Sequence, residues 1–216
     1  MTLEERVKRL TAELPEEERV RAAAAADPLA RFLSFLLEKN ATMNLVSARS
    51  ADPVALVRTH LFDALFGLAF LPRPRGRPTR LLDLGSGGGF PAIPLLLVRT
   101  DLEGTLVESS GKKAAYLREA LLHLALTARV VNARFPDSFP MGGTPQVDVL
   151  TTRAVASAGR LVRAARPLLS PDARALLWTS EPLAATAARE SRAARSSFHR
   201  APGAERRGIL TLECFT

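Results

Sequence analysis

The spacing of hydrophobic residues divides this chain into two parts with different predicted structures. Through residue 70, apolar residues recur every three or four positions, which is typical of amphipathic helices. Four helices are predicted to begin at Thr2, Pro15, Asp27 and Asp52. The third is expected to end near residue 39, before a polar loop over 40–50, and the fourth to continue to about residue 70.

After residue 79 the pattern changes to short apolar runs that alternate with helical stretches. Strands are expected near 80–84, 104–108, 129–132, 147–151, 174–178 and 208–215, and helices near 91–99, 112–126, 157–166 and 182–195. This alternation predicts an α/β fold with helices on both faces of a mostly parallel sheet. The proline-rich stretch 72–78 separates the two patterns, so we expect a helical lobe over 1–71 and a second domain over 80–216, packed as one unit.

One segment, Asp83-Leu84-Gly85-Ser86-Gly87-Gly88-Gly89-Phe90, is especially informative. A strand, a glycine turn and a helix follow one another there, as in the nucleotide sites of open α/β sheets. A dinucleotide fingerprint would need a third glycine at position 90, where Phe90 stands. An acid two residues before G-x-G-x-G instead resembles the first motif of methyltransferases that use S-adenosylmethionine (SAM). A glycine-rich surface turn is the alternative.

Charged residues after the glycine loop extend the predicted site. Glu108 ends the second expected strand, 23 residues after Gly85, where an acid binds the ribose hydroxyls in related dinucleotide sites; a helix-capping acid is the alternative. Lys112 and Lys113 begin the next helix, where cations are unfavourable unless they face an anion. That anion would be a nucleic-acid phosphate or the cofactor's carboxylate, and a solvated surface pair is the other interpretation.

The charge of the chain favours a polyanionic partner. Its 216 residues carry 30 Lys and Arg against 22 Asp and Glu, a net charge of +8, which is typical of nucleic-acid binding. Residues 153–207 hold eleven Arg and four acids, whereas residues 1–27 hold five basic residues and seven acids. A GC-rich genome would explain the preference for Arg over Lys but not the positive sign.

Composition also narrows the compartment and the chemistry. The single cysteine, Cys214, excludes an internal disulfide and fits a reducing cytosol. The apolar runs 64–71 and 92–98 are too short to span a bilayer, so a cytoplasmic protein without a membrane association is expected. No Cys/His pair has zinc-ligand spacing, and we expect no metal.

Several reaction classes lack their motifs here. The segment after the fourth strand, Thr151-Thr152-Arg153, contains no Asn-Pro-Pro-Tyr motif for adenine N6, and no Pro-Cys motif supports thiol attack on cytosine. His60 and Asp63 can share a helix face, but no G-x-S-x-G elbow accompanies them. Those two residues are expected to hold substrate or to pack the helical lobe against the glycine loop.

These motifs together resemble the bacterial 16S rRNA guanine-N7 methyltransferases, the glucose-inhibited division protein B family. The similarity extends from about residue 40 to residue 212. It is carried by Asn44-Leu45-Val46-Ser47, His60-Leu61-Phe62-Asp63, the glycine loop with Phe90-Pro91-Ala92-Ile93-Pro94-Leu95, Ser109–Leu117 and Arg153–Ala156.

The resemblance implies a class I, Rossmann-like methyltransferase sheet and a set of site residues. Cofactor-binding residues would be Gly85, Gly87, Phe90, Glu108, Arg134, Phe135, Pro136 and Arg153. Substrate residues would be Asn44, His60, Asp63, Lys112 and Lys113. The chain departs from the family at Phe135-Pro136, where a small residue and an acid are expected, and at Trp178-Thr179, where Lys-Gly is common. Trp178 would stack on a base or, alternatively, pack in the lobe.

The predicted function is therefore SAM-dependent methyl transfer to N7 of a guanine in 16S rRNA. N7 carries a lone pair and no proton, so the reaction needs alignment rather than a general base. The expected partner is 16S rRNA or the small ribosomal subunit, and we expect a monomer. The alternatives are a SAM-binding module that docks on RNA without turnover, and a small-molecule methyltransferase.

Overall fold

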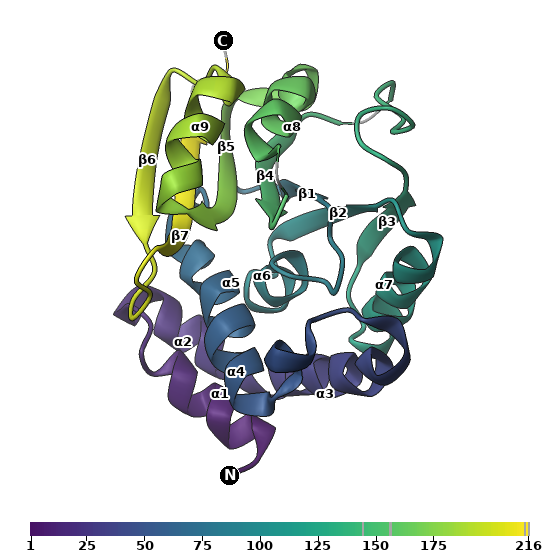
Figure 1. The fold of residues 1–216 in the computed structure, drawn as a ribbon, viewed down its shortest axis with the longest axis vertical. Helices are drawn as coiled ribbons and strands as arrows, with labels where there is room; N and C mark the ends of the chain where they lie inside the picture. The colour runs from purple at the N-terminus through teal and green to yellow at the C-terminus, as the bar shows by residue number, and fades with distance from the viewer. Residues whose placement is uncertain (144, 156, 214, 216) are drawn as a thin grey trace.

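A twisted β-sheet forms the centre of the molecule (Figure 1). The computed structural model describes residues 1–143, 145–155, 157–213 and 215, and within them the sheet has seven strands in the order β3-β2-β1-β4-β5-β7-β6. The strands are β1 (Thr79–Leu84), β2 (Leu102–Glu108), β3 (Ala128–Asn132), β4 (Val147–Arg153), β5 (Leu169–Ser180), β6 (Arg195–Arg200) and β7 (Arg207–Glu213). Strands β1 to β5 run parallel to one another, and β7 runs antiparallel to both β5 and β6. The expected α/β class is confirmed.

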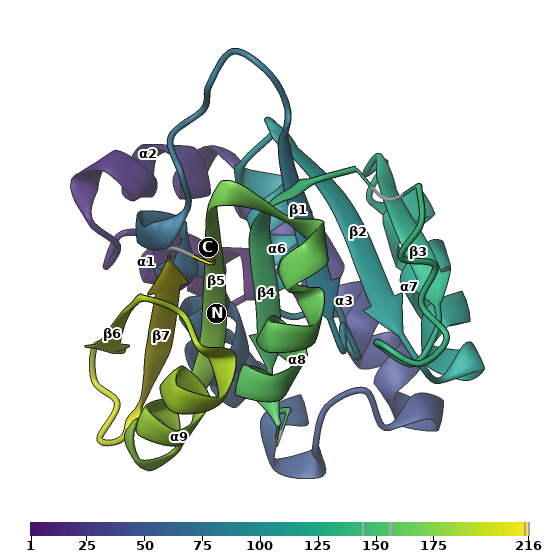
Figure 2. The same cartoon turned by 90° about the horizontal axis from the view of Figure 1, so that it is seen from above.

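Helices cover both faces of this sheet, because neighbouring strand residues point to opposite sides. Leu81 packs with α6 (Ala92–Val98) and α7 (Gly111–His123), whereas Leu82 packs with α8 (Ala158–Ala165) and α9 (Glu181–Ser191). Figure 2 shows α8 and α9 in front of the sheet and the N-terminal helices behind it. Each face therefore has its own hydrophobic core.

The N-terminal helices are α1 (Leu3–Thr11), α2 (Glu16–Ala24), α3 (Ala26–Met43) and a continuous run of α4 (Pro53–Leu56), a π-helical turn (Val57–Leu61), α5 (Phe62–Phe66) and a 3₁₀ turn (Gly67–Phe70). Three of the four predicted N-terminal helix starts, at Thr2, Pro15 and Asp52, are confirmed. The third is wrong, because α3 begins at Ala26 with Ala25 as its N-cap, and Asp27 lies inside the first turn instead of capping it. Thr2 and Glu5 form a reciprocal capping box with distances of 3.1 and 2.7 Å. Asp52 Oδ1 accepts the backbone N–H groups of Val54 and Ala55 at 3.0 and 2.9 Å.

Besides the start of α3, two further predicted boundaries are wrong. Residues 40–43 continue α3 instead of starting a loop, and the chain turns at Asn44, whose φ is +48°. Asn40 Oδ1 accepts the N–H groups of Leu45 and Val46 at 2.7 and 2.9 Å and so fixes this turn. At the other end of the chain, α9 stops at Ser191 instead of near residue 195, and residues 195–200 form β6, a strand that the hydrophobic pattern did not predict.

The helix Pro53–Phe70 is longer than the apolar run considered from the sequence. Among the residues described here it alone is long and apolar enough to cross a membrane, with a mean hydropathy of 1.3. Half of it is buried inside the protein, and core helices pass the same test of length and composition.

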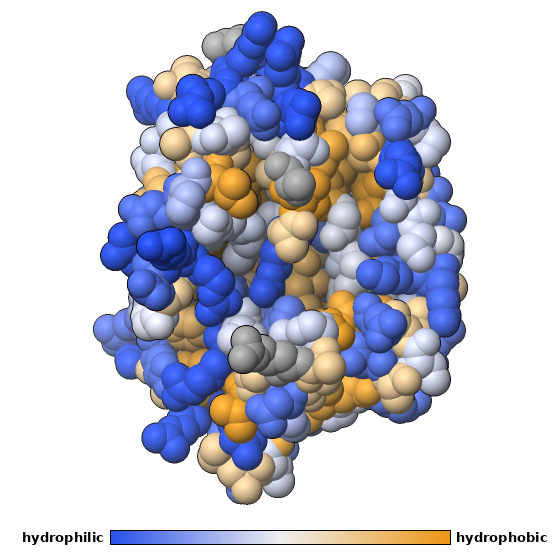
Figure 3. Space-filling view, viewed as in Figure 1, coloured by the Kyte–Doolittle hydropathy of each residue, from blue (hydrophilic) through white to orange (hydrophobic). Residues whose placement is uncertain are grey.

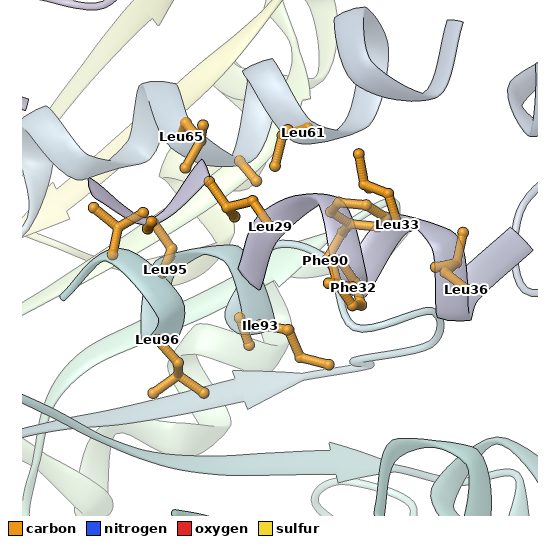
Figure 4. Packing of buried hydrophobic residues seen from close by; sticks show 14 of the residues in the cluster. Leu29, Phe32, Leu33, Leu36, Leu61, Leu65, Phe90, Ile93, Leu95 and Leu96 are labelled. Atoms are coloured by element: carbon orange, nitrogen blue, oxygen red, sulfur yellow. The ribbon is translucent and has the colours of Figure 1, made fainter. Parts of the chain in front are cut away.

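Packing between α3, the Pro53–Phe70 helix and α6 places the glycine loop. Figure 4 shows side chains of all three elements directed toward one another, with Phe90 beside Phe32 of α3. The two rings meet edge to face with centroids 5.1 Å apart. The N-terminal helices therefore lie directly against the segment that follows the glycines.

Candidate functional site

The glycine loop lies at the carboxyl end of β1, between the ends of β2 and β4. The N–H groups of Gly85 and Ser86 both donate to the carbonyl of Val107 in β2, at 2.9 and 3.1 Å. Gly85 and Gly87 have φ values of +79° and +50°, a region that favours glycine. These bonds turn the chain sharply as it leaves the strand.

The glycines of this loop face two different environments. A Cβ added to Gly87 would meet only the Gly85 carbonyl oxygen within 4 Å, at 3.8 Å. A Cβ on Gly89 would lie 2.6 Å from Ile93 Cδ1, in the core. Gly87 therefore leaves room on the outer side of the loop where a ligand can approach the backbone, whereas Gly89 allows close packing of α6.

Glu108 is buried beside this loop at the end of β2. One carboxylate oxygen accepts the N–H of Gly87 at 2.9 Å and the other accepts the N–H of Ser110 at 2.8 Å. A carboxylate oxygen can accept more than one hydrogen bond. Glu108 thus orders the loop and keeps acceptor capacity for the hydroxyls of a ribose.

Asp83, just before the loop, is a second buried acid. Its Oδ1 accepts the hydroxyl of Thr151 at 2.6 Å, and its Oδ2 is buried without a hydrogen-bond partner. Burial raises the pKa of Asp83 to about 6. A buried acceptor without a donor beside a nucleotide-type loop fits a ligand that carries a cationic or N–H group.

The segment Arg134-Phe135-Pro136 forms a turn after β3, next to the end of β2. The N–H of Ala133 donates to the Glu108 carbonyl at 3.1 Å, which connects this turn to the end of β2. The Phe135 ring packs on Phe139 with centroids 5.3 Å apart, while Arg134 and Pro136 are exposed. The departure from the family at 135–136 therefore lies at the edge of the site.

Arg153, at the end of β4, reaches across to the Pro53–Phe70 helix. Its guanidinium donates to the carbonyls of Thr59 and His60 at 3.0 and 3.4 Å and lies 5.9 Å from the centre of the Phe90 ring. The His60 ring packs against the Phe90 ring, with the two centroids 5.3 Å apart. Burial, Arg153 and Arg207 lower the pKa of His60 to about 4, so its imidazole is neutral at pH 7.

An ionic cluster around Asp63 connects three elements and includes a residue that the sequence did not indicate. Asp63 Oδ2 accepts Arg207 of β7 at 2.8 Å and lies 3.8 Å from Arg153. Burial raises the pKa of Asp63, and the two arginines oppose that rise. Arg207 is 144 residues away in the sequence, and no local motif points to it.

Trp178 packs in the lobe instead of presenting a free face. Its indole N–H donates to the main-chain carbonyl of Asp63 at 2.6 Å, and a Cβ on Gly67 would lie 2.4 Å from its ring. The side chain is buried, which favours the packing alternative over base stacking.

The remaining predicted substrate residues lie at the rim. Asn44 is exposed at the turn after α3, while the following Leu45 packs over Gly88. Lys112 donates to the carbonyl of Thr42 at 3.2 Å, near the C-terminus of α3, and Lys113 is half-buried. Lys112 is therefore exposed, and its ammonium group also lies favourably near the negative, C-terminal end of the α3 dipole.

Two of the cavities along the sheet help to locate the site. One of about 440 Å³ lies at the carboxyl ends of β4 and β5 and is lined in part by Asp63, Arg153, Val155 and Arg207. Figure 3 shows the corresponding face hollowed at its centre, between α8 and the N-terminal helices. A larger one of about 960 Å³ lies at the opposite strand ends, around the 72–75 linker, where most of its charged side chains pair with one another. The smaller cavity is the one that adjoins the glycine loop.

No group of three or more His, Cys, Asp or Glu side chains that could hold a metal ion occurs among the described residues. Cys214 lies outside those residues.

Comparison with known proteins gives consistent relatives. The sequence profile of the GidB family, described as rRNA small subunit methyltransferase G, matches residues 26–200. The chain is 41% identical over 149 residues to ribosomal RNA small subunit methyltransferase G of Xanthomonas oryzae pv. oryzae, covering 68% of this chain and 66% of the relative. It is 41% identical over 150 residues to the protein of the same name from Stenotrophomonas maltophilia, with coverages of 69% and 66%. The matched region thus spans just under two thirds of these relatives.

Solved structures show the same fold at low sequence identity. A precorrin-6y C5,15-methyltransferase from Geobacter metallireducens aligns with a TM-score of 0.55 and 13% identity, over 69% of this chain and 86% of that one. The mitomycin 7-O-methyltransferase aligns with a TM-score of 0.56 and 19% identity, over 93% and 74%. The sheet is therefore of the class I methyltransferase type.

Proposed function

Because the chain belongs to the rRNA small subunit methyltransferase G family, we propose that it transfers the methyl group of SAM to N7 of a guanine in the 16S RNA of the small ribosomal subunit. The observation that carries this proposal is the glycine loop with an open outer side, flanked by the buried acids Asp83 and Glu108. Family membership supports the rRNA substrate, and the site supports the cofactor.

The residues around the loop fit SAM. Gly85 and Gly87 would allow SAM to approach the backbone of the loop closely, and Glu108 would accept hydrogen bonds from the ribose hydroxyls. Asp83, with an unpartnered buried oxygen, fits the amino group of the methionine part. Phe90, at the end of the glycine loop, and the 134–136 turn, after β3, would border the remaining parts of SAM.

Methyl transfer to N7 would require these residues to align the reactants and to exclude competing groups. When bound, SAM supplies an electrophilic methyl group on a sulfonium. The acceptor N7 has a free lone pair and loses no proton, so no general base is required. His60, whose ring lies 5.3 Å from that of Phe90, has a pKa lowered to about 4 and is therefore a weak base, and its ring packing suits an aligning role.

RNA binding would use the basic rim. Lys112, Lys113 and Arg153 lie on the same edge of the sheet as the loop, and residues 153–207 hold eleven Arg against four acids. We propose that RNA phosphates contact this edge, that the two parts 1–71 and 80–216 act together as one unit, and that the protein is a cytoplasmic monomer without a membrane partner.

The direct test incubates the protein with labelled SAM and small ribosomal subunits or 16S rRNA from cells that lack the enzyme. We expect 7-methylguanosine in the RNA, identified by mass spectrometry and by chemical cleavage at the modified base. Label on adenine, on cytosine or on protein would refute the proposed acceptor. SAM binding by calorimetry without any transfer would support the alternative of a docking module.

A further inference from the structure

The cavity beside the glycine loop has the position and the size of a base-binding pocket. It occupies about 440 Å³, within the range of about 300–1,000 Å³ that is usual for small-ligand pockets. Val155 lines it and also adjoins the loop, since a Cβ on Gly85 would lie 3.3 Å from Val155 Cγ2. Leu183 of α9 lies at its rim and is 57% exposed, which offers an apolar surface to a planar ring. A base in this cavity would therefore be a neighbour of the cofactor loop.

The polar groups of the cavity centre on Asp63. Arg207 and Arg153 both approach Asp63 Oδ2, at 2.8 and 3.8 Å, and Trp178 occupies its main-chain carbonyl. No described residue donates a hydrogen bond to the other carboxylate oxygen, Oδ1. Burial raises the pKa of Asp63, and the two arginines oppose that rise. In its ionised form the carboxylate is an acceptor only.

We propose that this cavity receives the target guanine and that Asp63 selects it by accepting hydrogen bonds from N1–H and the N2 amino group. The inference rests on the proposed function and deepens it, because it names the side chain that distinguishes the acceptor base. Guanine presents two adjacent donors on its Watson–Crick edge. Adenine has an acceptor at N1 and no amino group at C2, so the same carboxylate would repel it.

The geometry around Asp63 agrees with transfer to N7. His60 lies one helical turn before Asp63 and packs against Phe90, at the end of the glycine loop. The five-membered ring that carries N7 is on the far side of guanine from N1 and N2. A base whose Watson–Crick edge is held at Asp63 therefore keeps its N7 side free for the cofactor.

The experiment compares guanosine with inosine, which keeps N7 and N1–H but lacks the N2 amino group. Each nucleoside is placed at the methylated position of 16S rRNA by ligation of a synthetic fragment, and the RNA is assembled into small subunits. Single-turnover methyl transfer by the wild-type protein should be roughly 10- to 100-fold slower on inosine, the loss of one hydrogen bond to a charged acceptor. Equal rates on the two nucleosides would overturn the proposal, and this comparison requires no variant.

Asp63→Asn then locates the interaction on the protein. The variant should transfer more slowly to guanosine but lose the discrimination, so that its guanosine-to-inosine rate ratio approaches one. Asp172→Asn is the matched control, because Asp172 is an exposed acid paired with Arg75 at the opposite edge of the sheet, and its ratio should equal that of the wild type. A wild-type ratio in folded Asp63→Asn would overturn the assignment to Asp63.

Failure of the inference differs visibly from failure of the proposed function. If the wild-type protein binds SAM but methylates no guanosine in the unmodified RNA, the proposed function is wrong and the inference with it. If guanosine is methylated at N7 without discrimination against inosine, only the inference is wrong.

Discussion

Gly87→Ala offers a sharp test of the cofactor site, because the structure separates its effect on binding from its effect on folding. The added methyl group would meet only the Gly85 carbonyl oxygen, at 3.8 Å, so the protein has room for it. Placing alanine at φ +50° costs about 1–2 kcal/mol. For a chain of this size the melting temperature should fall by roughly 2–8 °C.

The effect on SAM should be larger. The methyl group would project from the outer side of the loop, where the cofactor must approach the backbone closely. We expect the Kd for SAM, measured by calorimetry, to rise at least about tenfold, equivalent to about 1.4 kcal/mol. The N–H of residue 87 would still reach Glu108, so the change tests space rather than the loss of a hydrogen bond.

Gly89→Ala is the matched control in the same loop. Its Cβ would lie 2.6 Å from Ile93 Cδ1 and 3.3 Å from Phe32 Cζ, and its φ is +92°. Overpacking of this kind costs about 1–3 kcal/mol in addition to the backbone strain, while SAM affinity of the folded protein should stay near the wild-type value. Wild-type affinity in Gly87→Ala, or selective loss of SAM binding in Gly89→Ala alone, would refute the assignment of the outer side to the cofactor.

Three further outcomes are expected. Burial raises the pKa of Asp83 from 3.8 to about 6, so the native protein binds more protons than the unfolded chain between these values, and stability is full below pH 3.8 and lost as the pH rises through about 6. Asp83→Asn should therefore be more stable than the wild type at pH 7.5, on the order of 3 kcal/mol by denaturant titration, with the difference closing toward pH 4; a constant difference would contradict this. Combined Lys112→Ala and Lys113→Ala should lower the slope of log affinity for RNA against log salt by about 1 to 2 and leave SAM affinity nearly unchanged, whereas loss of SAM with unchanged RNA binding would assign these lysines to the cofactor. Asp52→Ala should lower the free energy of unfolding by about 0.5–2 kcal/mol, because two helix N–H groups lose their acceptor; an unchanged melting curve would show that this cap contributes nothing.

Local signals sufficed for the parts of the fold whose determinants are close in sequence. The order of strand, glycine turn and helix at 80–98 and the cap at Asp52 depend on neighbouring residues, and both are present as expected. The boundary errors arose where a distant or unusual contact decides. Residues 182–195 have the composition of a helix. Residues 195–200 are instead stabilised as a strand by pairing with β7, a contact that no local pattern predicts.

The candidate site shows the same division. The motif and its spacing predicted that Gly87 and Glu108 both belong to the cofactor site, and in the structure Glu108 accepts the N–H of Gly87 at 2.9 Å. The ion pair of Asp63 with Arg207 could not be predicted from the sequence, because its two residues lie 144 positions apart in the chain. The role of Trp178 was also undecidable from sequence, since its indole partner is a main-chain carbonyl.

The place of β7 has a consequence for how the protein is made. The last described strand to be synthesised lies inside the sheet, between β5 and β6, and it also brings Arg207 to Asp63. Until β7 emerges, β5 has an open edge and β6 has no neighbour to join, and such edges invite pairing with other chains. A ribosome that translates this protein must therefore complete nearly the whole described chain before either the sheet or the Asp63 cluster can close.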